Sequence, residues 1–117
     1  MRLITLCWLL TAFLLALSPN HAEAEQRLVI KYRSTPVDVD KPYFESLDTS
    51  GSSLVRGAWY DKSKRYMIIS LNGTNYHYCG LDEDTWSSFK SSDSFGRAYN
   101  STIKGNFDCR IFPVPSY

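Results

Sequence analysis

The dipeptide Asn72-Gly73 places a tight turn between two stretches with strand-like patterns. Both positions tolerate positive φ, so the pair favours a two-residue β-hairpin. Such a turn also fixes the register of the two strands, because a slip by one residue would exchange their faces. The predicted partners are Leu71 with Thr74, Ile69 with Tyr76, and Met67 with Tyr78.

The register predicts two faces of different polarity, because side chains alternate along a strand. The apolar face carries Met67, Ile69, Leu71, Tyr76 and Tyr78. The more mixed face carries Ile68, Ser70, Asn75, His77 and Cys79. Residues 54–60 form a third strand pattern, and residues 61–64 turn the chain into the hairpin. We therefore predict three antiparallel strands over residues 54–60, 65–71 and 74–79.

Two segments with one apolar face follow the hairpin. Residues 82–84 supply a capping aspartate and acidic first-turn charges, and Trp86 and Phe89 share a face three residues apart. The second helix is expected to begin near Asp93 or Ser94 and to end at residues 104–105. Its apolar face holds Phe95, Tyr99 and Ile103. These patterns predict an α+β fold: a small antiparallel sheet of three to five strands with two short helices packed on one face.

The flanking segments are less regular. Residues 28–32 predict a short strand, and alternation over residues 37–40 predicts a second edge strand between two prolines. Residues 49–53 resemble a turn or hinge, and residues 106–110 a strand or an extended segment. Residues 111–117 contain two prolines and are expected to form a tail.

The N-terminus has the order of a secretory signal peptide. Met1-Arg2 supplies positive charge, residues 3–17 are largely apolar, and Ala22-Glu23-Ala24 offers a small-residue cleavage site. The apolar run is shorter than the roughly 20 residues that a membrane span requires. We expect cleavage after Ala24, which leaves 117 minus 24, or 93, residues in the periplasm or the medium. No membrane span is expected after cleavage, and a retained anchor is the alternative.

Two cysteines, Cys79 and Cys109, remain after cleavage. An even number of cysteines in an oxidising compartment favours one disulfide, with two free thiols as the alternative. Closing a loop of about 31 residues would stabilise the fold by roughly 3–4 kcal/mol. Only His77 lies near Cys79, and two candidate ligands do not make a zinc site, so we expect no metal.

Motifs for catalysis are absent from the sequence: there is no nucleophile elbow, zinc-protease helix or glycine-rich phosphate loop. His77 and Cys79 share a strand face, but a disulfide would remove the thiolate that such a pair needs. His77 is therefore interpreted as a surface histidine. We expect no enzymatic activity and no cofactor, and an unrecognised hydrolase or thiol enzyme is the less favoured alternative.

A formal net charge of +1 gives the chain no long-range field for nucleic acid or anionic lipid. Anion binding must therefore depend on a local patch. Arg97, Asn100 and Lys104 lie at i, i+3 and i+7 of the second helix and share a stripe. The stripe could contact phosphate, an acidic glycan or an acidic protein surface. Its alternative interpretation is a solvated helix face.

Tyr76 and Tyr78 are the second candidate pair. Aromatic side chains on a sheet can stack on unpaired bases. They can equally form the core under a helical layer, with their hydroxyls at the rim. Their position beside Met67 and Ile69 favours the core interpretation.

These elements together resemble the KTSC domain, a small module named after the C-terminus of some lysyl-tRNA synthetases and also found alone in short bacterial proteins. The Asn-Gly hairpin, the Tyr-x-Tyr motif of residues 76–78 and the Ser-x-Gly-Arg-x-x-Asn-x-x-Ile-Lys-Gly run of residues 94–105 carry the resemblance. It covers about half of the chain and implies the fold, with nucleic-acid binding as a suggested family role. The signal, the extra N-terminal strand and the late cysteines depart from cytoplasmic members, and export argues against tRNA as the partner.

The sequence thus divides into a signal peptide (1–24), an N-terminal extension (25–52), a KTSC-like domain (53–110) and a tail (111–117). We expect a small exported, non-catalytic binding module whose ligand is a nucleic acid or another polyanion. An envelope protein that acts through structural or protein contacts is the alternative. The candidate ligand-binding residues are Tyr76, Tyr78, Arg97, Asn100 and Lys104.

Overall fold

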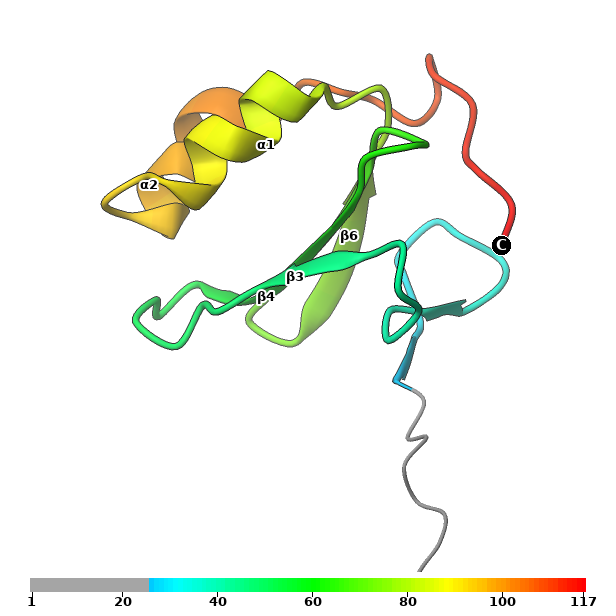
Figure 1. Ribbon diagram of the computed structural model, residues 1–117, viewed down its shortest axis with the longest axis horizontal. Helices are drawn as coiled ribbons and strands as arrows, with labels where there is room; N and C mark the ends of the chain where they lie inside the picture. The colour runs from blue at the N-terminus through cyan, green and yellow to red at the C-terminus, as the bar shows by residue number, and fades with distance from the viewer. Residues whose placement is uncertain (1–25) are drawn as a thin grey trace, which may run out of the picture.

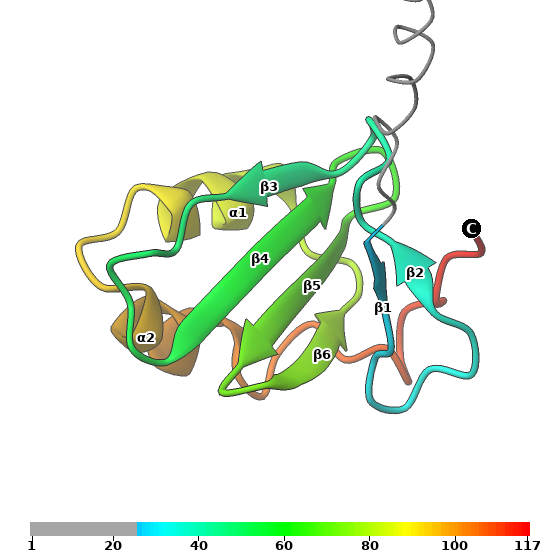
Figure 2. The same ribbon diagram turned by 90° about the horizontal axis from the view of Figure 1, so that it is seen from below.

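The structure is a computed structural model that describes residues 26–117, so the expected signal peptide lies outside the described residues. Two antiparallel sheets and a helical layer make up the fold (Figures 1 and 2). In chain order the elements are β1 (Arg27–Leu28), β2 (Val37–Asp38), β3 (Glu45–Leu47), β4 (Val55–Asp61), β5 (Tyr66–Leu71), β6 (Thr74–Tyr78), α1 (Glu83–Lys90), α2 (Phe95–Ala98) and the π-helical turn η2 (Tyr99–Ile103).

The larger sheet has the strand order β3-β4-β5-β6, and the predicted hairpin is its second half. Asn72 and Gly73 both have positive φ, 50° and 92°, as a two-residue turn of this kind requires. The predicted register is confirmed, because the structure pairs Leu71 with Thr74, Ile69 with Tyr76 and Met67 with Tyr78. The predicted α+β class is confirmed as well.

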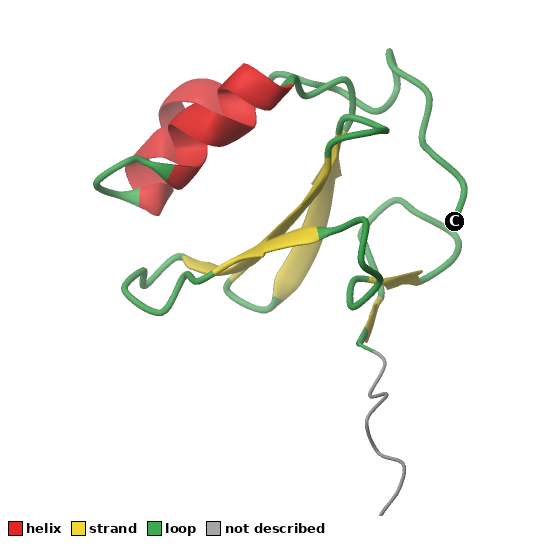
Figure 3. Cartoon of the chain, in the orientation of Figure 1, coloured by secondary structure: helices red, strands yellow, loops and turns green. Residues whose placement is uncertain are grey.

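The helices cover the apolar face of this sheet, as Figure 3 shows. Asp82 and Ser94 are the N-cap residues of α1 and α2, as predicted, and the Ser94 hydroxyl accepts a hydrogen bond from the Arg97 amide (3.2 Å). The second helix ends in a π turn that the sequence did not predict, closed by the Lys104 amide and the Tyr99 carbonyl (2.9 Å). The buried residues between sheet and helices are Val55, Ala58, Tyr60, Met67, Ile69, Leu81, Trp86, Phe89, Tyr99 and Ile103.

Strand β3 was not predicted, because it has only three residues and no clear alternation. It is the edge strand beside β4, and it is tied to the helical layer through the Glu45 carboxylate. Trp86 Nε1 donates to one Glu45 oxygen (3.0 Å), and Lys90 Nζ donates to the other (2.8 Å). These hydrogen bonds lower the pKa of Glu45.

The N-terminal extension covers the other face of the sheet. The strand expected over residues 28–32 is much shorter, because the pairing with β2 ends at Leu28 and Tyr32 lies in the left-handed region (φ 68°). The second edge strand, expected over residues 37–40, is β2, which pairs with β1. The buried residues on this side are Ile30, Val37, Val39, Phe44, Tyr66, Ile68 and Cys79.

The C-terminal residues are irregular, but the fold holds them in place. Residues 106–110, expected to be a strand or extended, form turns and contact β6 through one backbone hydrogen bond, from the Cys79 amide to the Phe107 carbonyl (2.9 Å). The ring of Tyr117 stacks on Tyr43 at 5.4 Å, and its hydroxyl donates to the buried Asp61 carboxylate (2.8 Å). The segment of residues 111–117 therefore packs as a strap along the sheet.

The predicted disulfide between Cys79 and Cys109 is confirmed, with the two Cα atoms 4.8 Å apart. Cys79 is buried directly after β6, whereas Cys109 lies two residues before the strap. The bond therefore fixes the base of the strap to the edge strand of the sheet.

Reduction of this disulfide should lower the free energy of unfolding by roughly 3–4 kcal/mol, because the unfolded chain would regain the entropy of the closed loop. Urea unfolding with and without reductant measures the difference. The double variant Cys79→Ala/Cys109→Ala is the control, and its unfolding should not respond to reductant. Two free thiols in the unreduced, denatured parent protein would contradict the prediction.

Candidate functional site

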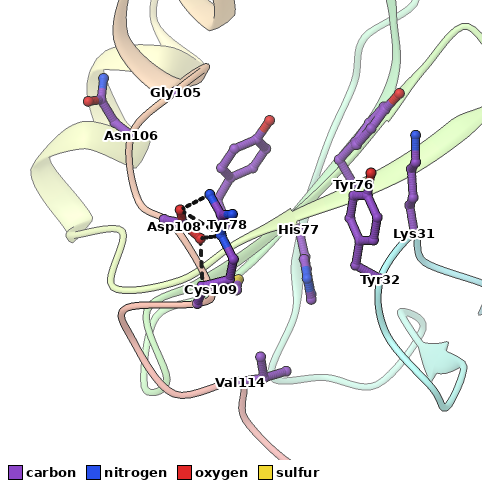
Figure 4. Close-up of a pocket in the computed structure, with 11 residues that line it drawn as sticks. Lys31, Tyr32, Tyr76, His77, Tyr78, Gly105, Asn106, Asp108, Cys109 and Val114 are labelled. Atoms are coloured by element: carbon purple, nitrogen blue, oxygen red, sulfur yellow. Dashed lines mark hydrogen bonds and ion pairs between the residues drawn. The ribbon is translucent and has the colours of Figure 1, made fainter.

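A groove of about 640 Å³ runs along the free edge of β6. We call it the β6 groove (Figure 4). One wall comes from the turn that follows β1, and the other comes from the turns around the disulfide, so segments from both ends of the domain meet here. Its lining residues are Lys31, Tyr32, Tyr76, His77, Tyr78, Gly105, Asn106, Asp108, Cys109, Arg110 and Val114.

Tyr76 and Tyr78 belong both to the core and to the groove. Both are partly buried and pack against the cluster beneath the helices, as the register predicts. The Tyr78 hydroxyl forms a short hydrogen bond with the Tyr99 hydroxyl, and burial raises the pKa of Tyr78. Figure 4 shows the two rings on one side of β6 and the His77 ring on the other. The edges of the tyrosines are thus available at a surface that their core contacts keep rigid.

The cationic groups of the groove differ in their pairing. Arg110 is tied to Asp108 by an ion pair of 2.7 Å, and its hydrogen bonds lower the pKa of Asp108 to about 2. Lys31 has no carboxylate partner among residues 26–117. Its ammonium lies 5.2 Å from the centre of the Tyr32 ring and 5.6 Å from that of Tyr76. Lys31 therefore supplies an exposed positive charge beside two aromatic faces.

His77, interpreted as a surface histidine, is partly buried and lines the β6 groove. Arg33 Nη1 donates to the Tyr66 hydroxyl (3.3 Å), and that hydroxyl lies 2.7 Å from His77 Nδ1. The hydroxyl and Nδ1 share one hydrogen bond, in which the hydroxyl is the donor when Nδ1 carries no proton. Burial first and the Arg33 charge second lower the pKa of His77.

The structure does not bring the predicted stripe and the tyrosines into one cavity. Arg97, Asn100 and Lys104 are all exposed, and none of them lines the β6 groove. Lys104 is nevertheless the residue before Gly105, which does line it, so the stripe ends at the rim. The anion-binding role of the stripe stays a prediction.

Sequence reasoning missed the walls of the groove. Lys31 and Tyr32 were assigned to a strand, and Asn106 to Arg110 to an extended segment. Nothing local marks these residues as neighbours of Tyr76. The one available signal was the cysteine pair, because a bond from Cys79 to Cys109 places residues 106–110 beside the end of β6.

Residues 26–117 contain neither a metal-binding cluster nor a membrane-spanning helix. No group of three or more histidine, cysteine, aspartate or glutamate side chains in this range could hold a metal ion. Among the helices of the same range, none has the length and apolar character needed to cross a membrane.

The hairpin, the two helical segments and their packing on one face define a small α+β domain of the type that the sequence resembles. Residues 51–107 match the model of the KTSC domain family, and this part of the chain belongs to that family. The crystal structure of a KTSC domain protein from Yersinia pestis is 26% identical over 73% of this chain and 93% of its own, with a TM-score of 0.47. The comparison with curated proteins yields no match.

Replacing Tyr78 by alanine should lower the free energy of unfolding by a few kcal/mol, because it empties an aromatic site in the core and leaves Tyr99 without its partner. Tyr78→Phe keeps the ring and should cost only about 1 kcal/mol, the usual net value of one hydrogen bond. Chemical denaturation of the three proteins gives the comparison. Equal stability of Tyr78→Ala and the parent would show that the ring is not a packing residue.

The protein should lose stability in mild acid through His77. The pKa of His77 in the folded state lies below the 6.5 of an unperturbed histidine. Between these two values the unfolded state therefore binds more protons than the folded state. The stability that the neutral His77 side chain contributes to folding is present above about pH 6.5. It is lost as the pH falls through the pKa of His77 in the folded state. His77→Gln cannot titrate, so its melting temperature should fall less steeply between pH 7 and pH 5. Parallel curves for parent and variant would contradict the assignment.

Proposed function

We propose that this protein is a small exported binding module without catalytic activity, and that it takes an anionic ligand in the β6 groove. One observation carries the proposal: the exposed Lys31 ammonium has no carboxylate partner in the described chain and lies beside the rings of Tyr32 and Tyr76. A concave surface with aromatic walls and a few convergent polar groups is the usual form of a ligand site.

The distribution of charge favours an elongated anion. Lys31 stands on one wall, Arg110 on the other, and the Arg97 to Lys104 stripe extends beyond the rim. The carboxylate of Asp108 offsets the positive charge of Arg110 but not that of Lys31. Single-stranded nucleic acid and other polyanions have the required chemistry, since phosphates would meet the cations and bases the tyrosine faces.

Two features support a binding role over a catalytic one. The Cys79 thiol is consumed in the disulfide, so it cannot act as a nucleophile. His77 Nδ1 is already hydrogen-bonded to the Tyr66 hydroxyl, and no second histidine or free thiol lies in the described part of the groove. What remains is a set of aromatic rings, cations and backbone groups, which suits recognition.

An envelope protein is the second candidate partner, and the apolar side chains around the groove favour it. Tyr32 is 85% exposed, Ile111 75% and Val114 42%. Clustered apolar side chains with a polar rim are typical of protein contacts. Export, which the N-terminal pattern predicts, also places the chain among envelope proteins.

The test uses the chain without its signal, residues 25–117, and fluorescence-labelled probes at two salt concentrations: hexauridylate, polyphosphate and an acidic peptide. Lys31→Ala should weaken binding several-fold and reduce the dependence of log K on log salt by about one unit, because one cation is lost. Lys41→Ala removes another exposed lysine that does not line the groove, and it should bind like the parent.

Comparison with Arg97→Ala/Lys104→Ala separates the groove from the stripe. If only this double variant loses affinity and salt dependence, the anion contacts belong to the stripe. If the parent binds none of the three probes at low salt, the proposed function is wrong.

A further inference from the structure

Strand β6 is an edge strand, so one side of its backbone has no strand partner. The two-residue turn makes Leu71 and Thr74 a hydrogen-bonded pair, and such pairs alternate with pairs that point their backbone groups outward. Asn75 and His77 therefore direct their N–H and C=O groups away from β5 and into the space along the edge.

The chain itself covers this edge at two points. The Lys31 amide donates to the Asn75 carbonyl (2.9 Å), and the Cys79 amide donates to the Phe107 carbonyl (2.9 Å). His77 lies midway between these contacts. No backbone group within residues 26–117 pairs with its outward N–H or C=O. The edge strand is thus closed at both ends of the groove and open at its middle.

The two covering segments turn away at residues with unusual backbone conformation. Tyr32 (φ 68°) directly follows Lys31, and Phe107 (φ 57°) is itself the acceptor residue on the other wall. Side chains other than glycine rarely adopt positive φ, and such residues are concentrated at functional sites. An extended conformation at either position would carry the chain further along β6. The fold instead keeps the edge at His77 uncovered.

The surroundings of the open edge suit a short extended segment. A strand that pairs with His77 would alternate its side chains between the two sides of β6. One side offers Tyr76 and Tyr78, and the other offers the His77 ring and Val114 (Figure 4). Lys31 on one wall favours an acidic residue at that end of the segment, whereas Arg110 on the other wall is already paired with Asp108.

We propose that the β6 groove binds an acidic-ended, extended peptide segment of a partner protein, which exchanges a pair of backbone hydrogen bonds with His77. This inference rests on the proposed function and specifies its ligand class. Strand addition to a sheet edge is an established way of binding peptides, in which main-chain hydrogen bonds give affinity and side pockets give specificity. Only one residue of the peptide can pair with the backbone of β6, because the strand edge is open only at His77.

The probe is the labelled pentapeptide acetyl-Glu-Val-Val-Val-Glu-amide. Its β-branched centre favours an extended conformation, and a glutamate at each end lets the peptide meet Lys31 in either strand direction. In the paired state the N–H of the central valine donates to the His77 carbonyl. N-methylation of that valine should weaken binding by about tenfold, because it removes this donor and leaves a carbonyl unsatisfied. N-methylation of the valine before it, whose N–H points away from β6, should change affinity by less than about threefold.

The protein side has a matched pair of variants. Val114→Glu places a carboxylate inside the groove and should weaken binding of the acidic peptide by about tenfold. Val29→Glu adds the same charge at a side chain that is 75% exposed and does not line the groove, so it should bind like the parent. Amide hydrogen exchange gives a direct readout: the His77 amide should exchange readily in the free protein and become protected when the peptide binds.

The outcomes separate the inference from the proposed function. Peptide binding with His77 protection and sensitivity to central N-methylation supports both. Binding of hexauridylate but not of the peptide, or peptide binding without His77 protection, overturns the inference and leaves the anion-binding groove standing. If the two N-methylated peptides lose affinity equally, the inference is also overturned. If neither the pentapeptide nor any of the three anionic probes binds at low salt, both the inference and the proposed function are wrong.

Discussion

The register between β5 and β6 decides most of what this domain can do. With Leu71 opposite Thr74, Met67 and Ile69 point toward the helices, and Tyr66 and Ile68 point toward the N-terminal extension. A slip by one residue would exchange these sets and expose both cores. The same register turns the backbone of His77 outward. The Asn-Gly turn therefore determines the packing of the sheet and the position of its open edge together.

Burial of both faces of β5 explains why such a short chain needs its irregular segments. Residues 66–69 are essentially inaccessible to solvent, although an antiparallel sheet commonly leaves one face in water. The helices cover one side, and the N-terminal extension with the C-terminal strap covers the other. The continuous apolar run Tyr-Met-Ile-Ile was a signal of this two-sided burial. The alternation along the hairpin indicated only a mixed second face, so no covering role was predicted for the segments that pack on it.

Local signals accounted for most of the fold. The turn dipeptide, the capping residues and the apolar spacing of Trp86 and Phe89 each act within a few residues, and the hairpin and both helix starts were predicted from them. Strand β3 was missed because its pairing with β4 and the Glu45 contacts to α1 are all long-range. The groove was missed for the same reason. Its tyrosines were predicted as candidates, but Lys31 and Arg110 reach them only through tertiary packing.

The strap has a mechanical consequence for the groove. It is covalently fixed at Cys109, Phe112 packs directly over Gly80, and Tyr117 is held at the far end by Asp61. Between these anchors Val114 forms part of the groove lining. A wall that is held at several points loses little conformational entropy when a ligand binds, which favours affinity. The disulfide thus contributes to a preformed site as well as to the stability of a small domain.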